Sequence, residues 1–241
     1  MRYNQLISVE IPSSVIKIEE AAFQDCENLY SIEIPNIVTE IESFTFCGCT
    51  NLRTIEIPDS VTEIGESAFE GCKSLTSIQI PNSVIEIGDY AFRACKSLTS
   101  IQIPDGVRII GECAFYECTG LTSIVIPNSV TKIRCDAFSQ CTNLSSIELQ
   151  SSDISIIAFA VSGCVNLDTI IVEGDIKNID ILDSLETDDN IENDIDDDFC
   201  IERYKKYGEY SGSYAQDVEG WSDQDIDDVF DGDPDAYWNI D

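Results

Sequence analysis

The stretch IPDSVTEIGESAFEGCKSLTSIQ, residues 57–79, decides the fold because the chain repeats it. Its proline, Pro58, recurs every 23 residues, at Pro12, Pro35, Pro81, Pro104 and Pro127. A unit of this size cannot bury its own apolar side chains, whereas stacked units give each internal one two neighbours to pack against. The fixed period therefore predicts a solenoid.

Each unit is expected to contain one short strand. Leu52 is followed by Ile55 and Ile57, so apolar and polar residues alternate before the proline. This two-residue period is typical of a strand with one buried face, and proline ends the strand because it has no N–H to donate. The leucine position returns in the other copies as Leu6, Leu29, Leu75, Leu98, Leu121, Leu144 and Leu167.

The rest of the unit is expected to lead back to the next strand. A second apolar pair, Val61 and Ile64, follows the proline, and Gly65 is expected to permit a sharp turn. The Ala-Phe-x-x-Cys-x-x-Leu stretch has apolar residues at helical spacing, which predicts a single short helical turn. Serine hydroxyls just beyond the strand are expected to bond to loop backbone groups, at Ser14, Ser60, Ser83 and Ser129.

The pattern IPxSVxxIGxxAFxxCxxLTSIxI resembles the BspA-type leucine-rich repeats, first noted in surface proteins of oral anaerobes. The resemblance covers residues 1 to about 180, in about seven units without an insertion. It implies a repeat solenoid, a right-handed superhelix with parallel β-strands on the concave face and short helical or β turns on the convex side. It also suggests adhesion or host contact. The predicted solenoid domain comprises residues 1–185.

Seven of the eleven cysteines, here called the cysteine ladder, occupy the same place in successive units: Cys26, Cys49, Cys72, Cys95, Cys118, Cys141 and Cys164. One interpretation is metal binding or a redox stack. The other is that cysteine, a small apolar residue, fits a repeated pocket and donates its S–H weakly to a loop carbonyl. Because the ladder recurs beside the apolar repeat positions, we expect reduced, buried thiols. Outside it, Cys47 could approach Cys49, and Cys113 could approach Cys135, but we favour the interpretation that these are free thiols near the convex side.

The net charge of −33 is unevenly distributed along the chain. Residues 1–172 carry 22 acidic and 9 basic residues, whereas residues 173–241 carry 24 and 4. A field of this sign repels nucleic acid and anionic membranes. No long apolar stretch indicates a signal peptide or membrane span. We therefore expect no nucleic-acid partner, no membrane insertion and, for the sequence as written, a cytoplasmic location. The family resemblance leaves the cell surface or secretion as the alternative.

The repeat pattern stops after Leu185. Residues 186–198, ETDDNIENDIDDD, predict a solvated acidic linker. Residues 199–241 are acidic as well, yet they hold nine of the chain's 21 aromatic residues. Their alternating aspartates do not fit an EF-hand, because the required Gly and Glu positions are not matched. We interpret this segment as a cap on the solenoid or a docking motif, whose apolar surface would comprise Trp221, Phe230, Tyr237 and Trp238.

No feature of the sequence indicates catalysis or a cofactor. The chain has no histidine, so the commonest general base and the commonest zinc nitrogen ligand are missing. It contains no GxSxG, Walker or dinucleotide-binding motif. We therefore predict a protein that is not an enzyme and has no cofactor or metal site.

The outward-pointing strand positions are the candidate partner-binding surface. Counted from the strand leucine, the third position is always serine or threonine, whereas the second and fifth vary. In a parallel stack these positions form columns on one face, which in leucine-rich repeats is the concave face. Short polar side chains also simply suit an exposed β-face, so both interpretations stay open. The candidate residues are Tyr30, Glu33, Arg53, Glu56, Gln79, Gln102, Val125 and Glu148, of which Tyr30, Arg53 and Val125 break the consensus.

Two functions of different classes fit these observations. The first is a protein-binding solenoid that uses its concave β-face as an adaptor, a scaffold or an adhesion-like protein. The alternative is a structural or assembly protein that self-associates by stacking its uncapped first strand, Leu6 to Ile11, on another molecule. Exposed solenoid ends and strand edges pair readily with other chains, which is the physical basis of the second function.

Overall fold

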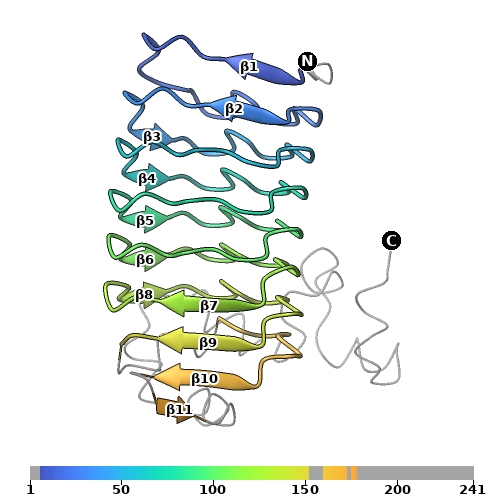
Figure 1. The fold of residues 1–241 in the computed structure, drawn as a ribbon, viewed down its shortest axis with the longest axis vertical. Helices are drawn as coiled ribbons and strands as arrows, with labels where there is room; N and C mark the ends of the chain where they lie inside the picture. The colour runs from blue at the N-terminus through green and yellow to red at the C-terminus, as the bar shows by residue number, and fades with distance from the viewer. Residues whose placement is uncertain (1–5, 152–159, 173–174, 178–241) are drawn as a thin grey trace. The chain divides into compact units, whose positions relative to one another are not determined.

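The structure is a computed structural model that describes residues 6–151, 160–172 and 175–177. These residues form a parallel β-solenoid of about seven turns, so the predicted repeat solenoid is confirmed. Figure 1 shows the turns stacked as successive coils. The predicted linker, 186–198, and the predicted C-terminal segment, 199–241, lie outside the described residues, as does the end of the predicted solenoid domain.

One side of each coil carries the predicted strands. They pair in parallel with a constant register, so that Ser8 lies opposite Ser31 and Ser123 lies opposite Ser146. Between the second and fifth turns the pairing is reduced to single bridges, from Glu33 through Glu56 and Gln79 to Gln102. The strands of this side are β1 (Ser8–Glu10), β2 (Ser31–Glu33), β7 (Ser123–Ile126), β9 (Ser146–Leu149) and β10 (Thr169–Val172).

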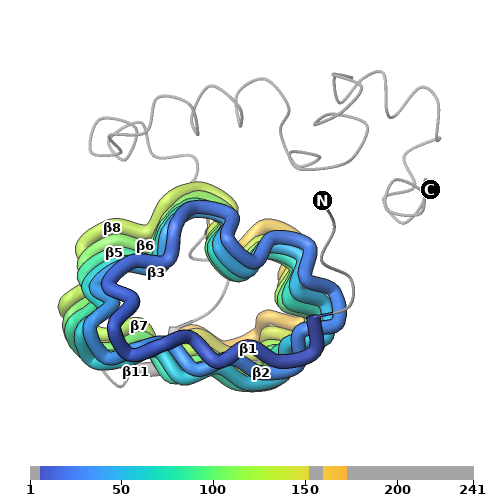
Figure 2. The backbone as a smooth tube through the Cα atoms, turned by 90° about the horizontal axis from the view of Figure 1, so that it is seen from above, coloured from blue at the N-terminus to red at the C-terminus, as the bar shows by residue number. Residues whose placement is uncertain are grey.

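A second parallel sheet, which the sequence did not predict, runs along another side of the coil (Figure 2). Its two-residue strands come from the second apolar pair of each unit, with isoleucine buried in β3, β4, β5 and β6 and half-buried in β8. The strands are β3 (Glu40–Ile41), β4 (Glu63–Ile64), β5 (Glu86–Ile87), β6 (Ile109–Ile110) and β8 (Lys132–Ile133).

The last strand reverses the direction of the chain. β11 (Asp175–Lys177) pairs with β10 in antiparallel fashion, with Ile171 opposite Ile176. Every other pairing in the described residues is parallel. The parallel stack therefore ends at β10.

The predicted helical turn is not a helix, because no helix occurs in the described residues. Consecutive turns take its place: in the third unit Cys72 N–H donates to the Phe69 carbonyl and Leu75 N–H donates to the Cys72 carbonyl. In each of the first six units, two residues have left-handed backbone dihedrals, as at Ser67 (φ 50°) and Gly71 (φ 69°). Because residues in this conformation cannot continue a right-handed helix, the apolar spacing ends in tight turns instead.

The glycine before this segment has a different role from the one predicted. Gly65, Gly88 and Gly111 do not have left-handed dihedrals. Instead, a Cβ on Gly88 would lie 2.7 Å from the backbone of Gly65 in the preceding turn. Close approach of one turn to the next therefore requires glycine here.

Stacked phenylalanine rings form the centre of the core. Phe46, Phe69, Phe92, Phe115 and Phe138 are fully buried, and Phe23 at the first turn is half-buried. Successive rings are 5.2 to 5.5 Å apart between centroids and nearly parallel. One ring per turn thus makes a continuous aromatic column along the solenoid.

The serine prediction is confirmed at two positions and wrong at one. Ser60 Oγ donates to the Val38 carbonyl at 2.6 Å, and Ser83 Oγ donates to the Val61 carbonyl at 2.5 Å. The buried Ser129 hydroxyl has no hydrogen-bond partner.

Candidate functional site

The candidate surface is the outward side of β1, β2, β7, β9, β10 and the bridged segments between them, here called the strand face. Strand pairing in constant register places equivalent residues of successive turns side by side. In β2, for example, Ile32 points into the core while Ser31 and Glu33 are exposed. The backbone therefore holds the variable side chains in columns that run along the solenoid.

Tyr30 and Arg53, two of the predicted site residues, contact each other on this face. Arg53 N–H donates to the Tyr30 carbonyl at 3.2 Å, which fixes the two residues one above the other. The guanidinium carbon of Arg53 lies 5.6 Å from the centroid of the Tyr30 ring, a cation–π geometry. Tyr30 is 50% exposed, so the pair presents an aromatic and cationic surface to solvent.

The fifth-position column contains the other predicted site residues. Glu33, Glu56, Gln79 and Gln102 follow one another through parallel bridges, and all four are exposed. Val125 is 42% exposed and pairs with Glu148, which is half-buried. All eight predicted residues therefore lie on this face, distributed over six turns, with carboxylates at the early turns and amides at the middle ones.

A groove that the sequence did not reveal borders the early part of this column, where each strand meets its proline turn. Its volume is about 540 Å³. Ile34, Ile57 and Pro58 in its lining are buried, whereas Glu33 and Glu56 are exposed. Its full lining comprises Ile11, Ser13, Glu33, Ile34, Pro35, Asn36, Glu56, Ile57, Pro58 and Asp59.

The second sheet has a simpler outward face, on which three glutamates stack in register. Glu63 pairs with Glu40 on one side and with Glu86 on the other. Partial burial raises the pKa of Glu63, and the neighbouring carboxylates raise it further. Adjacent negative charges therefore disfavour the ionised form of Glu63 at this point.

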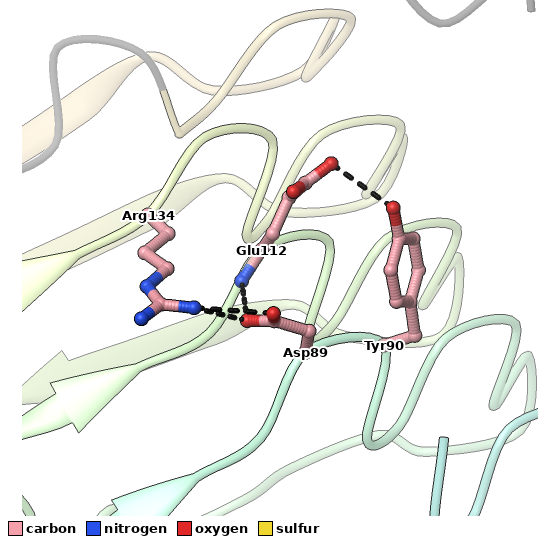
Figure 3. A network of polar contacts seen from close by, with 4 residues as sticks. All are labelled: Asp89, Tyr90, Glu112 and Arg134. Atoms are coloured by element: carbon pink, nitrogen blue, oxygen red, sulfur yellow. Dashed lines mark hydrogen bonds and ion pairs between the residues drawn. The ribbon is translucent and has the colours of Figure 1, made fainter. Parts of the chain in front are cut away.

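A polar network crosses the turns beside the second sheet (Figure 3). Arg134 occupies the place that glycine holds in the three preceding units, and its Nη1 lies 2.9 and 3.1 Å from the two carboxylate oxygens of Asp89. Asp89 also accepts the Glu112 N–H at 2.8 Å, and Tyr90 donates to the Glu112 carboxylate at 3.0 Å. The network links three turns and so stabilises the stack.

Comparison with known proteins identifies the repeat. The family model described as a BspA type leucine rich repeat region (6 copies) matches residues 1–121 and 63–182. The chain belongs to this BspA-type leucine-rich repeat family. A search of curated proteins gives no significant match.

Solved structures of bacterial leucine-rich repeat proteins resemble this BspA-type chain. It is 31% identical to the leucine-rich repeat protein TpLRR of T. pallidum, with a TM-score of 0.60, covering 67% of this chain and 78% of that one. A leucine-rich repeat protein from Bacteroides ovatus is 28% identical, with a TM-score of 0.55, covering 71% of this chain and 56% of that one. The match to TpLRR spans most of that protein.

The cysteine ladder of this BspA-type solenoid is built for packing. All seven ladder cysteines are buried free thiols. From the second turn on, each Sγ donates to the phenylalanine carbonyl of the preceding turn, as from Cys95 to Phe69 at 3.2 Å. Burial raises the pKa of the ladder thiols, to about 12 at Cys49 and Cys164. Because the thiolate is the reactive and metal-binding form, these side chains are poor nucleophiles and ligands.

Three of the four cysteines outside the ladder, Cys47, Cys113 and Cys135, lie in the described residues. Cys47 is a half-buried free thiol, and burial raises its pKa to about 11. Cys113 and Cys135 are buried in neighbouring turns, where Cys113 N–H donates to the Cys135 carbonyl at 3.0 Å. Over the described residues, no group of three or more Cys, Asp or Glu side chains is arranged to hold a metal ion.

The predicted docking residues, Trp221, Phe230, Tyr237 and Trp238, lie outside the described residues. In the part of the chain that the structure describes, no helix is long and apolar enough to cross a membrane.

Proposed function

We propose that this chain is a non-enzymatic protein-binding solenoid, with an adaptor, scaffold or adhesion-like role, and that the strand face is its binding surface. The observation that carries the proposal is the exposed Tyr30–Arg53 pair on this face. At the same strand position, the second from the leucine, the middle turns have threonine. The interior is nearly the same in each turn, so a change of side chain on this face alters recognition without altering the fold.

The chemistry of the pair supports this proposal. Tyrosine and arginine are enriched among the residues that contribute most to protein–protein affinity. The repeating backbone bonds hold them on a rigid support, which lowers the entropy that binding must overcome. Family membership points in the same direction, because leucine-rich repeat proteins generally mediate protein interactions.

The experiment is capture of partners from the native source, with covalent cross-linking and peptide mapping. We compare the wild-type chain with Tyr30→Ala/Arg53→Ala on the strand face and with Thr62→Ala/Ile85→Ala, exposed positions beside the second sheet. The proposal expects the first variant to lose a partner that the second retains. Equal retention by both variants would contradict it.

A third variant examines the C-terminal segment. The fourfold substitution Trp221→Ala/Phe230→Ala/Tyr237→Ala/Trp238→Ala removes the predicted docking side chains from the full chain. Loss of capture in this variant alone would move the binding surface from the strand face to residues 199–241. Fractionation of the native source, in parallel, distinguishes a cytoplasmic adaptor from a surface adhesin.

Self-association is the second candidate function, and the first turn favours it. Val9, Ile11 and Phe23 are only half-buried there, whereas their counterparts in the next turn, Ile32, Ile34 and Phe46, are buried. Ile7 and Ile16 are 67% and 68% exposed. Light scattering over a wide concentration range tests this function, and a constant monomer mass would eliminate it.

A further inference from the structure

The groove beside the strand face differs from the corresponding positions of later turns. Its lining repeats a strand glutamate and a turn residue, as at Glu33 with Asn36 and at Glu56 with Asp59. Two turns further along, the strand positions are Gln79 and Gln102 instead. Beside the groove, the fifth-position column therefore carries carboxylates, whereas at the next two turns it carries amides.

The groove combines an apolar floor with an acidic rim. Its apolar lining residues are isoleucines and prolines, of which Ile11 and Pro35 are half-buried, whereas Ile34, Ile57 and Pro58 are buried. Glu33, Glu56 and Asp59 are exposed around this floor, and no ion pair holds them within the described residues. Long basic side chains match this pairing, because their methylene stems cover apolar surface while their charged ends reach carboxylates.

The dimensions favour an extended segment. The lining spans three turns, from Ile11 to Ile57, and neighbouring strands are about 4.8 Å apart, so the floor is roughly 10 Å long. Three residues of extended chain cover about that length, and in a five-residue segment with basic residues at alternate positions the outer two lie just beyond its ends. A short segment in strand-like conformation therefore matches the length of the lining.

We propose that this groove binds an extended segment of a partner protein that carries Lys or Arg at alternate positions, with its basic groups at Glu33, Glu56 and Asp59. This inference rests on the proposed function, since it assigns the partner chemistry for one part of the same surface. Alternation places successive basic side chains on one side of the segment, as an extended backbone requires.

The test uses the full chain and a fluorescent peptide, Gly-Lys-Val-Lys-Val-Lys-Gly, with fluorescence anisotropy as the readout. The groove variant is Glu33→Gln/Glu56→Gln/Asp59→Asn. The control variant, Glu20→Gln/Glu66→Gln/Asp105→Asn, removes the same charge at exposed positions outside the groove. We expect the groove variant to bind about tenfold more weakly, and the control to stay within about twofold of wild type.

A second pair of variants tests the groove by shape alone. Asn36→Trp fills the groove without changing its charge, and Asn82→Trp places the same side chain at the equivalent position two turns later. We expect only Asn36→Trp to weaken binding. Thermal melts of each variant show whether the fold is retained.

Two results would overturn the inference. Equal weakening by both triple variants would show that the peptide senses only the overall negative charge. Equal binding of a peptide with Gln in place of Lys would show that basic groups do not select the ligand. Either result leaves the Tyr30–Arg53 capture experiment unaffected, so failure of this inference is distinguishable from failure of the proposed function.

Discussion

The interior of the solenoid and its strand face follow opposite rules. Inside, turn after turn presents the same phenylalanine and the same cysteine, each buried against its own copy. Outside, the first three turns present Ile7, Tyr30 and Arg53 at one equivalent position. A side chain that must pack against copies of itself has little freedom to change, whereas one that faces solvent can vary. Repetition therefore marks stability in this chain, and variation marks candidate recognition.

We expect alkaline pH to lower the free energy of unfolding more than any of the substitutions below, through the buried cysteines of the interior. Burial raises the pKa of the ladder thiols, so the folded chain keeps protons that the unfolded chain releases above about pH 9. The contribution of the ladder thiols to the free energy of unfolding is therefore fully present below about pH 9. It is lost as pH rises toward their pKa values in the folded chain. Each fully buried thiol, as at Cys72, Cys95 and Cys118, contributes up to about 1.4 kcal/mol per pH unit, and these contributions add. Urea unfolding between pH 7 and pH 10 measures the slope.

The cysteine variant Cys95→Ala serves as the control for this slope. It should unfold with a pH dependence smaller by about one proton than that of wild type. A wild-type stability that stayed constant up to pH 10 would show that the ladder thiols ionise in the folded chain, contrary to their burial.

Truncation of one ring should give the next largest effect. Phe92 is fully buried and lies 5.2 Å from Phe69 and 5.3 Å from Phe115 between ring centroids. Phe92→Ala leaves a cavity in the aromatic column, for which we expect a loss of about 3–5 kcal/mol in the free energy of unfolding. Thr76→Ala on the strand face should cost less than about 0.5 kcal/mol. Similar losses in the two variants would remove the contrast between interior and face.

Alanine substitutions at two glycines should distinguish the cost of a steric clash between turns from the cost of a left-handed backbone. A Cβ at Gly88 would meet the backbone of the preceding turn at 2.7 Å, so Gly88→Ala should destabilise the chain by more than about 2 kcal/mol. At Gly71 the nearest atom is 3.9 Å away and only the left-handed backbone opposes a side chain. Gly71→Ala should therefore cost about 1 kcal/mol. Chemical denaturation of both variants checks the order, and a reversed order would contradict it.

The smallest effect concerns the outward glutamates of the second sheet. The pKa of Glu63 is raised, so its ionised form lowers stability at neutral pH, and this penalty disappears as pH falls through the folded pKa. Glu63→Gln should stabilise the chain by a few tenths of a kcal/mol at pH 7, about the size of a like-charge pair across strands. Glu66→Gln, an exposed acid outside this column, should have no such effect. Thermal melts at low salt distinguish the two.

Much of the fold could be predicted from the sequence because one period repeats every packing position. The columns of Leu29, Phe46 and Cys49 follow directly from it, and all three residues are fully buried or nearly so. The second sheet was missed because two residues per strand, such as Glu63 and Ile64, are too few to show an alternating pattern.

The predicted helical turn failed for a related reason. The left-handed positions hold Ser67, Tyr90 and Cys113 in successive units, and none of these residue types signals that conformation as glycine does. At the second left-handed position of the unit, Gly48, Gly71 and Gly163 are the residues whose type indicates this conformation.

The candidate site was predictable only in part. The Tyr30–Arg53 contact follows from the register, because residues one period apart must lie side by side. The groove was not predictable, because it lies beside the turns of Asn36 and Asp59. The repeat pattern does not indicate where the surface beside such a turn is concave. Arg134 could have been noticed, since it replaces glycine in the repeat, but its partner Asp89 lies two turns away.

The parallel pairing on both sides of the coil also determines how the chain would respond to mechanical force. Bonds between turns point along the stacking direction, so tension applied along that direction acts on every interface at once, and a terminal turn, which has only one neighbour, detaches first. Each turn that detaches would release roughly 75 Å of extended chain. A chain stretched in this way would lengthen in equal steps from its ends, and would shield whatever is bound to the middle turns until last.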